Sequence, residues 1–172
     1  MTSTSPKAEQ FSGLILLTGE DKPGLAHSLF ETLSPFSVAV VDIDQIIIKE
    51  RLILTVQISL SPAHQSAIEE DLNSLAQSLN VDIAAVFSMS TIPTQKPEHF
   101  TLNMRSAKVH PKHLSVVTKS LLTLGANIED INRSETDPFE IVVKVSGISK
   151  AQLTELINTT DSGTDFSLTI GA

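Results

Sequence analysis

Residues 14–33 read LILLTGEDKPGLAHSLFETL, and this stretch decides the fold of the chain. The apolar run from Leu14 to Leu17 has the length of a buried strand. From Leu25 to Leu33 a leucine recurs at every fourth position, which predicts a helix with one apolar face. A strand that turns sharply into a helix leaves backbone N–H groups free at the helix start. Such N–H groups can bind a carboxylate or another small anion.

The loop between this strand and this helix contains Asp21, Pro23 and Gly24. Asp21 is expected to accept hydrogen bonds from the first helical amides, and Pro23 suits a first-turn position that needs no N–H. Asp-x-Pro-Gly is also a common turn and helix cap that binds nothing. The loop alone therefore leaves two interpretations open, a plain cap and a small ligand site.

Composition excludes several classes of protein. The 172 residues suffice for one ordinary domain or two small ones. The absence of cysteine excludes disulfides, a thiolate nucleophile and cysteine-ligated zinc. The formal charge is −8 and the basic residues are scattered, so direct binding to nucleic acid is not expected.

The N-terminus is predicted to be a disordered tail over residues 1–12, because Met1 to Gln10 is polar and rich in Ser and Thr. It has no apolar core, so it does not resemble a signal peptide. No apolar run approaches the ~20 residues of a membrane helix, and no membrane partner is expected. We expect a cytoplasmic protein.

The chain after the first helix continues the order β-α-β-β-α-β. Val38 to Glu50 and Leu52 to Leu60 are typical of a hairpin with a charged corner. Ser61 and Pro62 then begin a second helix, and Val81 to Met89 is a fourth strand. This order is the split βαβ, or ferredoxin-like, unit.

The second half repeats the first after a linker at residues 91–97. Val38 to Asp44 matches Ala126 to Asn132, with Asp42 on Asp130, an offset of 88 positions. The second half is expected to contain a hairpin around Asp137-Pro138. The predicted fold class is therefore α+β, with two ferredoxin-like units at residues 13–90 and 98–172. Each unit has an antiparallel sheet with its helices on one face.

This order, together with Asp-x-Pro-Gly, resembles the ACT domain, a small regulatory module that commonly binds amino acids. Thr18 to Leu33 and Val41 to Val56 are similar to the first of two ACT domains in actinobacterial-type phosphoserine phosphatases. Leu124 to Ile131 is similar to the same place in the second. The resemblance implies a catalytic domain after the second ACT domain, whereas this chain stops at Ala172.

Two departures from that family bear on the function. The second unit has Arg105 to His110 where Asp-x-Pro-Gly would stand, which leaves open whether it binds a ligand. Asp42 and Asp44 superficially resemble the Asp-x-Asp-x-Thr nucleophile loop of such phosphatases. However, Ile46 replaces the threonine and the strand pattern continues, so no catalytic role is expected.

Metal and cofactor sites are also not expected. His110 and His113 have a spacing that could ligate a metal, but no acid or third histidine accompanies them, and a capping or surface role is favoured. His27 could line the loop site or lie at the surface. No glycine-rich nucleotide loop or serine-hydrolase motif occurs.

The resemblance implies a non-catalytic module that binds an amino acid, with L-serine as the first candidate. The N–H groups of Gly24 and Leu25 would take the carboxylate and Asp21 the ammonium, and β-strand residues of a neighbouring unit would complete the cavity. The predicted ligand-binding residues are Asp21, Lys22, Pro23, Gly24, Leu25, Asp44 and Gln45.

The units are expected to pair through their sheet edges, within one chain or across a homodimer with exchanged halves. The other partner expected from this hypothesis is a catalytic phosphatase domain or a regulator protein. An alternative is a stand-alone tandem ACT regulator that resembles the glycine cleavage repressor accessory protein and acts through a protein partner. An enzyme is the third hypothesis, and no nucleophile with a matching base is visible in the sequence.

Overall fold

A computed structural model describes residues 9–91, 97–134, 140–160 and 166–171. The chain forms two compact units, Met1–Thr94 and Gln95–Ala172. Each unit has its own hydrophobic core and is described here by itself. The hairpin turn expected around Asp137-Pro138 lies outside the described residues.

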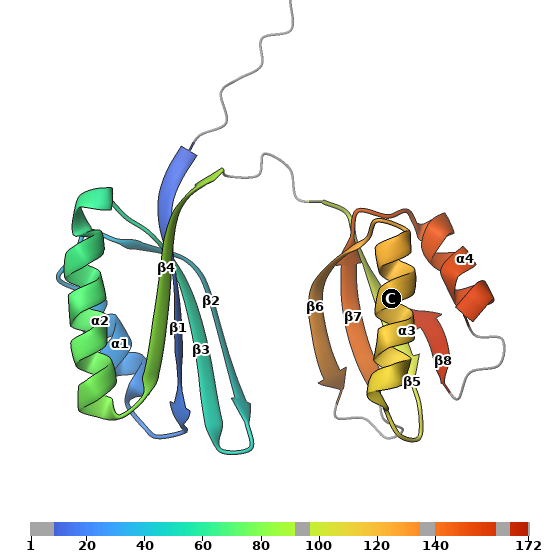
Figure 1. Ribbon diagram of the computed structural model, residues 1–172, viewed down its shortest axis with the longest axis horizontal. Coiled ribbons are helices and arrows are strands. Elements are labelled where there is room, and N and C mark those ends of the chain that lie inside the picture. Colours follow the sequence, from blue (N-terminus) through green and yellow to red (C-terminus); the bar gives the residue numbers. More distant parts are fainter. Residues whose placement is uncertain (1–8, 92–96, 135–139, 161–165, 172) are drawn as a thin grey trace, which may run out of the picture. The chain divides into compact units, whose positions relative to one another are not determined.

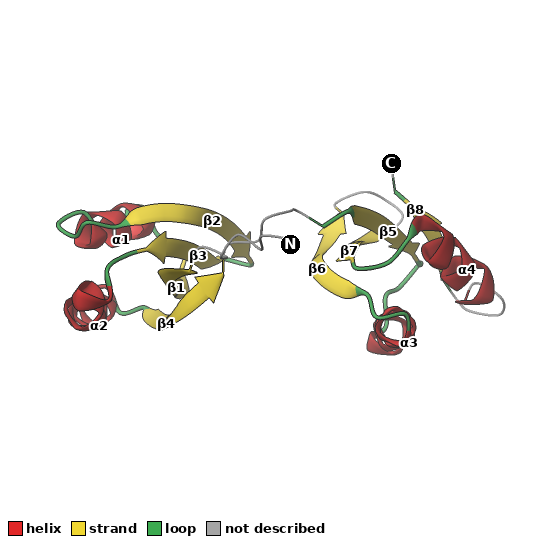
Figure 2. Ribbon diagram, turned by 90° about the horizontal axis from the view of Figure 1, so that it is seen from above, coloured by secondary structure: helices red, strands yellow, loops and turns green. Residues whose placement is uncertain are grey.

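Unit 1 has the order β-α-β-β-α-β (Figure 1). Its sheet is antiparallel, with the strand order β2-β3-β1-β4, so β2 and β4 are the edges. Both helices cover the same face of the sheet, and the other face is open (Figure 2). The elements are β1 (Glu9–Glu20), α1 (Leu25–Leu33), β2 (Ala39–Ile48), β3 (Arg51–Ser59), the 3₁₀ turn η1 (Pro62–His64), α2 (Gln65–Leu79) and β4 (Asp82–Thr91).

Unit 2 repeats this topology with the strand order β6-β7-β5-β8. A bulge interrupts β2 between Val40 and Asp42, and a matching bulge interrupts β6 between Ile128 and Asp130, 88 positions later. The predicted pair of ferredoxin-like units, in the α+β class, is therefore confirmed. The elements are β5 (His99–Arg105), α3 (Pro111–Thr123), β6 (Asn127–Ser134), β7 (Glu140–Ser146), α4 (Lys150–Thr160) and β8 (Ser167–Ile170).

The apolar patterns of the sequence form the two cores. In β3 every second side chain is buried against the helices, because successive strand residues point to opposite faces. The leucines of α1 meet this row, and Ile68 and Leu72 of α2 complete the core. In unit 2, Val117 and Leu121 of α3 occupy the corresponding face.

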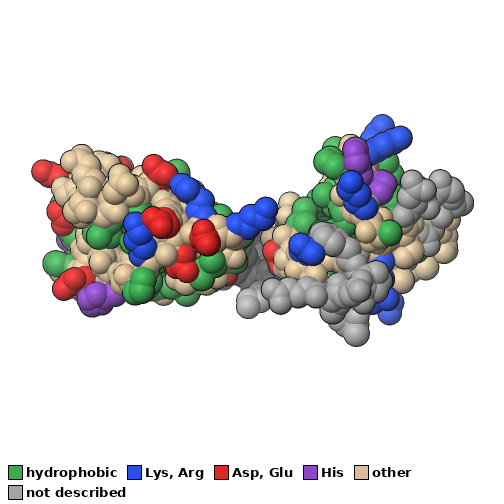
Figure 3. All heavy atoms as spheres, turned by 90° about the horizontal axis from the view of Figure 1, so that it is seen from below, with side chains coloured by type: hydrophobic (Ala, Val, Ile, Leu, Met, Phe, Trp, Pro, Cys, Tyr) green, Lys and Arg blue, Asp and Glu red, His purple; other side chains and the backbone are tan. Residues whose placement is uncertain are grey.

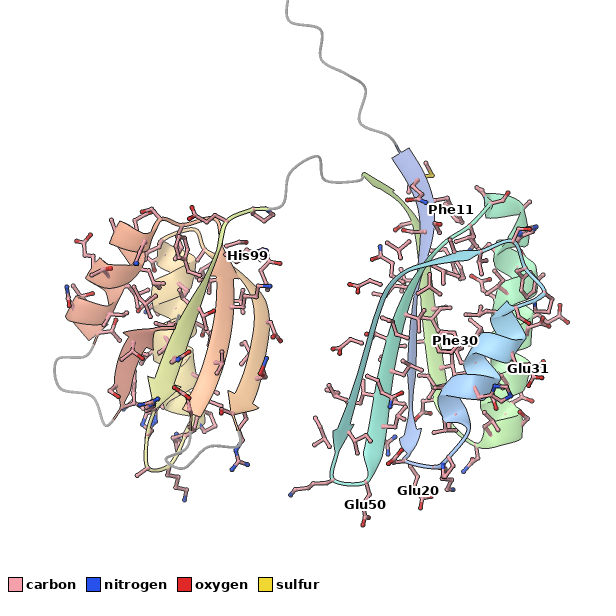
Figure 4. All side chains as sticks on the ribbon, turned by 180° about the vertical axis from the view of Figure 1, so that it is seen from behind. Phe11, Glu20, Phe30, Glu31, Glu50 and His99 are labelled. Carbon is pink, nitrogen blue, oxygen red and sulfur yellow. The ribbon has the colours of Figure 1, made fainter. Side chains whose placement is uncertain are left out.

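The first strand begins earlier than the sequence predicted. The tail was expected to extend to residue 12, but β1 starts at Glu9 and pairs with β4 from there onward. The ring of Phe11 stacks on that of Phe87, with centroids 6.3 Å apart (Figure 4). This cross-strand contact stabilises a polar stretch of β1 that alone carries no strand signal.

The β2–β3 hairpin has an unusual turn. Lys49 and Glu50 both have positive φ angles, 46° and 64°. A two-residue turn of this kind favours Asn-Gly, because most other residues are strained in a backbone conformation with positive φ.

We therefore expect the double substitution Lys49→Asn, Glu50→Gly to stabilise unit 1 by about 1 kcal/mol. Urea unfolding followed by circular dichroism measures this change. The control places the same two residue types in α4, as Lys150→Asn and Glu155→Gly. It should destabilise the protein instead, mainly through the glycine in the helix interior. A hairpin variant no more stable than the wild type would contradict the prediction.

Candidate functional site

The N-terminus of α1 has no side-chain cap. The helix begins at Leu25, and its N-cap residue is Gly24, which has no side chain to accept a hydrogen bond. The first intrahelical bond runs from Ser28 N–H to the Gly24 carbonyl at 2.9 Å. No side chain among the described residues caps the first-turn amides, so they are available to a carboxylate.

The prediction that Asp21 caps this helix was wrong. Asp21 lies three residues before the N-cap position, whereas a capping side chain must stand at the N-cap itself to reach the first-turn amides. Its backbone N–H instead donates to the Glu50 carbonyl at 2.7 Å, which ties the β1–α1 loop to the hairpin tip. Asp21 is exposed, and its carboxylate accepts no capping hydrogen bond from α1.

Gly24 is required for the backbone conformation of the loop. Its φ of 97° lies in the left-handed region that favours glycine. A Cβ added there would meet no atom within 4 Å, so the space above Gly24 is open within the unit. The Leu25 side chain is buried in the core, and only its backbone N–H can serve a ligand at this loop.

The loop also carries an exposed ion pair. Lys22 Nζ lies 2.7 Å from Glu20 Oε2. The hydrogen bond from Lys22 and its positive charge lower the pKa of Glu20 below its usual range. Glu20 and Glu50 lie at the same end of unit 1, next to the loop (Figure 4).

Asp44 and Gln45 lie away from this loop within the same unit. They stand on β2 opposite Thr55 and Leu54, and as neighbours in a strand they point to opposite faces of the sheet. Glu50, whose carbonyl binds the Asp21 N–H, lies six positions after Asp44, a separation of up to roughly 20 Å along the hairpin. A single unit therefore does not bring the two parts of the predicted site together.

The edge strand β2 exposes apolar side chains on both faces. All ten of its residues are exposed, although the strand is rich in Val and Ile. The two central isoleucines, Ile43 and Ile46, are 49% and 45% exposed. The other large apolar side chains exposed on this strand are Val40, Val41, Ile47 and Ile48.

A cavity of about 540 Å³ lies on the other side of the loop, and the sequence did not predict it. Of the predicted site residues it contains only Lys22. Acidic and basic side chains stand side by side at this end of unit 1 (Figure 3). Its lining residues are Thr18, Gly19, Glu20, Lys22, Arg51, Ala76, Gln77, Leu79, Asn80, Val81 and Asp82. They come from distant parts of the sequence, and no local motif marks them.

The aspartates of β2 and the histidines form neither a nucleophile loop nor a metal site within the described residues. Asp42 and Asp44 lie within β2 and not on a loop, and the Asp42 carboxylate accepts from the Ile43 N–H at 2.9 Å. His110 is the N-cap of α3 and forms a capping box with His113, so the expected capping role is confirmed. His27 is exposed and lies 3.7 Å from Glu31 on the same helix. Within the described ranges, no three metal-ligating side chains gather at one place.

None of the helices in the described part of the chain has the length and apolar character needed to cross a membrane.

Comparison with known sequences gives a family for the first unit. Residues 13–86 match the model of the ACT domain family. The chain is 30% identical over 122 residues to phosphoserine phosphatase SerB2 of Mycobacterium tuberculosis, covering 70% of this chain and 30% of that protein. It is 28% identical over 145 residues to phosphoserine phosphatase of Streptomyces coelicolor, covering 81% of this chain and 35% of that protein. The chain thus spans about a third of the length of these relatives.

Comparison with solved structures extends the likeness to both units. A crystal structure assigned as a glycine cleavage system transcriptional repressor has a TM-score of 0.76 and 16% identity, covering 95% of this chain and 96% of that one. The structure of an unknown protein from Galdieria sulphuraria has a TM-score of 0.63 and 17% identity. The match covers 95% of this chain and 98% of that one. At 16% and 17% identity, these two comparisons show a shared fold and do not show a shared function.

Proposed function

Because this chain belongs to the ACT domain family through its first unit, we propose that it is a non-catalytic regulatory module that binds a small amino acid, L-serine first among them. The two relatives described above are phosphoserine phosphatases. A phosphatase that acts on phosphoserine releases serine, so serine is a natural signal for a regulatory part of such a protein.

The observation that carries the proposal is the uncapped start of α1 beside Asp21. The amino acid carboxylate binds the N–H groups of Gly24 and Leu25, where the helix dipole favours negative charge. The ammonium binds the exposed Asp21 carboxylate, and Lys22 and Pro23 shape the rim of the site. This arrangement recognises the two charged groups that every free amino acid carries.

A neighbouring unit completes the site in this proposal. Its β2 brings Asp44 or Gln45 to the ligand, because the same two residues lie too far along β2 within one unit. Pairing through the β2 edge accounts for the Val and Ile side chains exposed along that strand. We therefore propose a homodimer that pairs through the β2 edges.

A second candidate function is that of a free-standing regulator that acts through a protein partner. The observation that favours it is the fold: the repressor-like structure matches this chain through both units, with a TM-score of 0.76. Gene context separates the two candidates, and an assay on phosphoserine tests the enzyme hypothesis directly.

Calorimetric titration with L-serine tests the proposed site. Asp21→Ala removes the ammonium partner, which is worth on the order of 1–3 kcal/mol for a charged hydrogen bond, or about 5- to 150-fold in affinity. Because Asp21 does not cap α1, we expect the variant to keep its stability within about 0.5 kcal/mol.

The matched control is Asp71→Ala, which removes an exposed aspartate from α2 and should bind serine as the wild type does. Glycine and L-alanine, titrated alongside, report the selectivity for the side chain. A wild-type protein that binds none of the three at millimolar concentration would refute the proposal. Equal affinity of Asp21→Ala and the wild type would refute the role of Asp21.

A further inference from the structure

The cavity beside the β1–α1 loop has the size of a ligand site. It lies where the ends of β1, β3 and β4 meet the last turn of α2, and its volume is about 540 Å³. Small-molecule sites occupy roughly 300–1,000 Å³, so this cavity has room for a small polar molecule.

Two backbone features form the wall of the cavity. Gly19 packs directly against Val81, since a Cβ on Gly19 would lie 2.6 Å from Val81 Cγ1. Asn80 ends α2 in the left-handed conformation, with φ 52°, and turns the chain sharply into β4. The path of the backbone at Gly19 and Asn80 therefore shapes this wall of the cavity.

The charges in the cavity are balanced and come from three strands and the loop. Lys22 pairs with Glu20 at 2.7 Å. Arg51 Nε donates to Thr18 Oγ1 at 3.3 Å, and Arg51 Nη2 lies 3.4 Å from Asp82 Oδ2. Two cations and two carboxylates thus face one space, and the lining carries no net charge.

The contact between Arg51 and Asp82 is loose. Charge-assisted hydrogen bonds are typically about 2.7–2.9 Å long, and this contact is longer at 3.4 Å. A ligand can therefore replace the contact between Arg51 and Asp82 with little loss of free energy, provided that it offers a negatively charged group to Arg51 and a positively charged group to Asp82. A simple anion or a simple cation would engage only one of these two side chains.

We infer that this cavity is a second ligand site of unit 1, which binds a small zwitterion of the amino acid type with a polar side chain. The zwitterion's carboxylate binds the Arg51 guanidinium and its ammonium binds the Asp82 carboxylate. The C-terminal end of α2 adds partial negative charge on the side of the ammonium. The site goes beyond the proposed function, because the cavity shares only Lys22 with the loop site and uses neither Asp21 nor the start of α1.

Titration of the ¹⁵N-labelled full chain with L-glutamine, followed by NMR, locates the binding. We expect the amide signals of Gly19, Asn80 and Asp82 to shift in a saturable manner. N-acetyl-L-glutamine lacks the ammonium and L-glutaminamide lacks the carboxylate, so each should bind at least about tenfold more weakly. Equal affinity of either compound and glutamine would overturn the zwitterion assignment.

A plug variant tests the cavity itself. Gln77→Phe places a large side chain into the cavity from an exposed position on α2, and we expect it to weaken glutamine binding at least about tenfold. The control Glu70→Phe puts the same side chain two turns earlier on α2, outside the cavity, and should bind as the wild type. A wild-type protein without saturable shifts at millimolar glutamine, or a plug variant with unchanged affinity, would overturn the inference.

The same spectra separate this site from the loop site. Shifts confined to Gly24, Leu25 and Ala26 would overturn the cavity site and leave the proposed function standing. Cavity shifts that persist in Asp21→Ala support the second site even if serine fails to bind the loop.

Discussion

Leu29→Ala is expected to lower the free energy of unfolding of unit 1 by about 2–5 kcal/mol. Leu29 is 0% exposed and belongs to the buried face of α1 that packs on the sheet. The substitution removes buried methyl groups and leaves a cavity that the surrounding strands can fill only in part. This loss is a large share of the 5–15 kcal/mol that stabilises a typical domain.

The chain contains no Trp and no Tyr, so urea unfolding is best followed by far-UV circular dichroism. Amide hydrogen exchange measures the local stability of each unit separately. Because each unit has its own core, Leu29→Ala should accelerate amide exchange in unit 1 and leave that of unit 2 unchanged.

The control Leu122→Ala removes the same atoms from a leucine of α3 that is 75% exposed. We expect its stability to stay within about 0.5 kcal/mol of the wild type. Similar losses in the two variants, or a loss below about 1 kcal/mol for Leu29→Ala, would show that the core does not pack as described.

Ile43→Lys is expected to weaken the proposed dimer on the order of 10- to 100-fold. Ile43 is 49% exposed in the unit, so each copy would lose the burial of about half an isoleucine side chain at the β2 edge, about 0.7–1.5 kcal/mol per copy, and the two losses act together. A lysine on an edge strand also opposes strand pairing directly. Light scattering over a range of protein concentrations measures the change.

The repeat supplies a matched control in Ile131→Lys. Ile131 occupies the position 88 residues after Ile43 and is 48% exposed, against 49% for Ile43. Its strand β6 already carries Glu129, Asp130 and Arg133, and such charges block an edge from pairing. We therefore expect Ile131→Lys to stay dimeric. A wild-type monomer at all concentrations, or equal effects of the two substitutions, would contradict pairing through β2.

The repeat itself shows why so much of the fold was readable from the sequence. Strand and helix periodicity place each apolar residue on one face, so the stripes of α1 and α3 and the alternation in β3 could be read directly. Local capping was also readable at His110, because a cap involves residues within one turn of each other.

The β1–α1 loop shows the limit of local reasoning. Asp-x-Pro-Gly predicted a turn into a helix, and the turn is present, but the starting residue of α1 decided that Asp21 does not cap it. The Glu50 carbonyl that binds the Asp21 N–H lies 29 positions away in the sequence and is brought close only by strand pairing.

The sequence by itself determined the two units, their topology and the apolar faces of their helices, because these depend on periodicity within single elements. Only the tertiary structure decided which polar residues share a space. Arg51 and Asp82 meet because β3 and β4 both pair with β1: Arg51 lies opposite Glu20, Asp82 lies opposite Thr18, and the Arg51 side chain reaches both Thr18 and Asp82. Strand pairing across 30 or more residues leaves no local pattern, so a cavity built in this way appears only when the chain is folded.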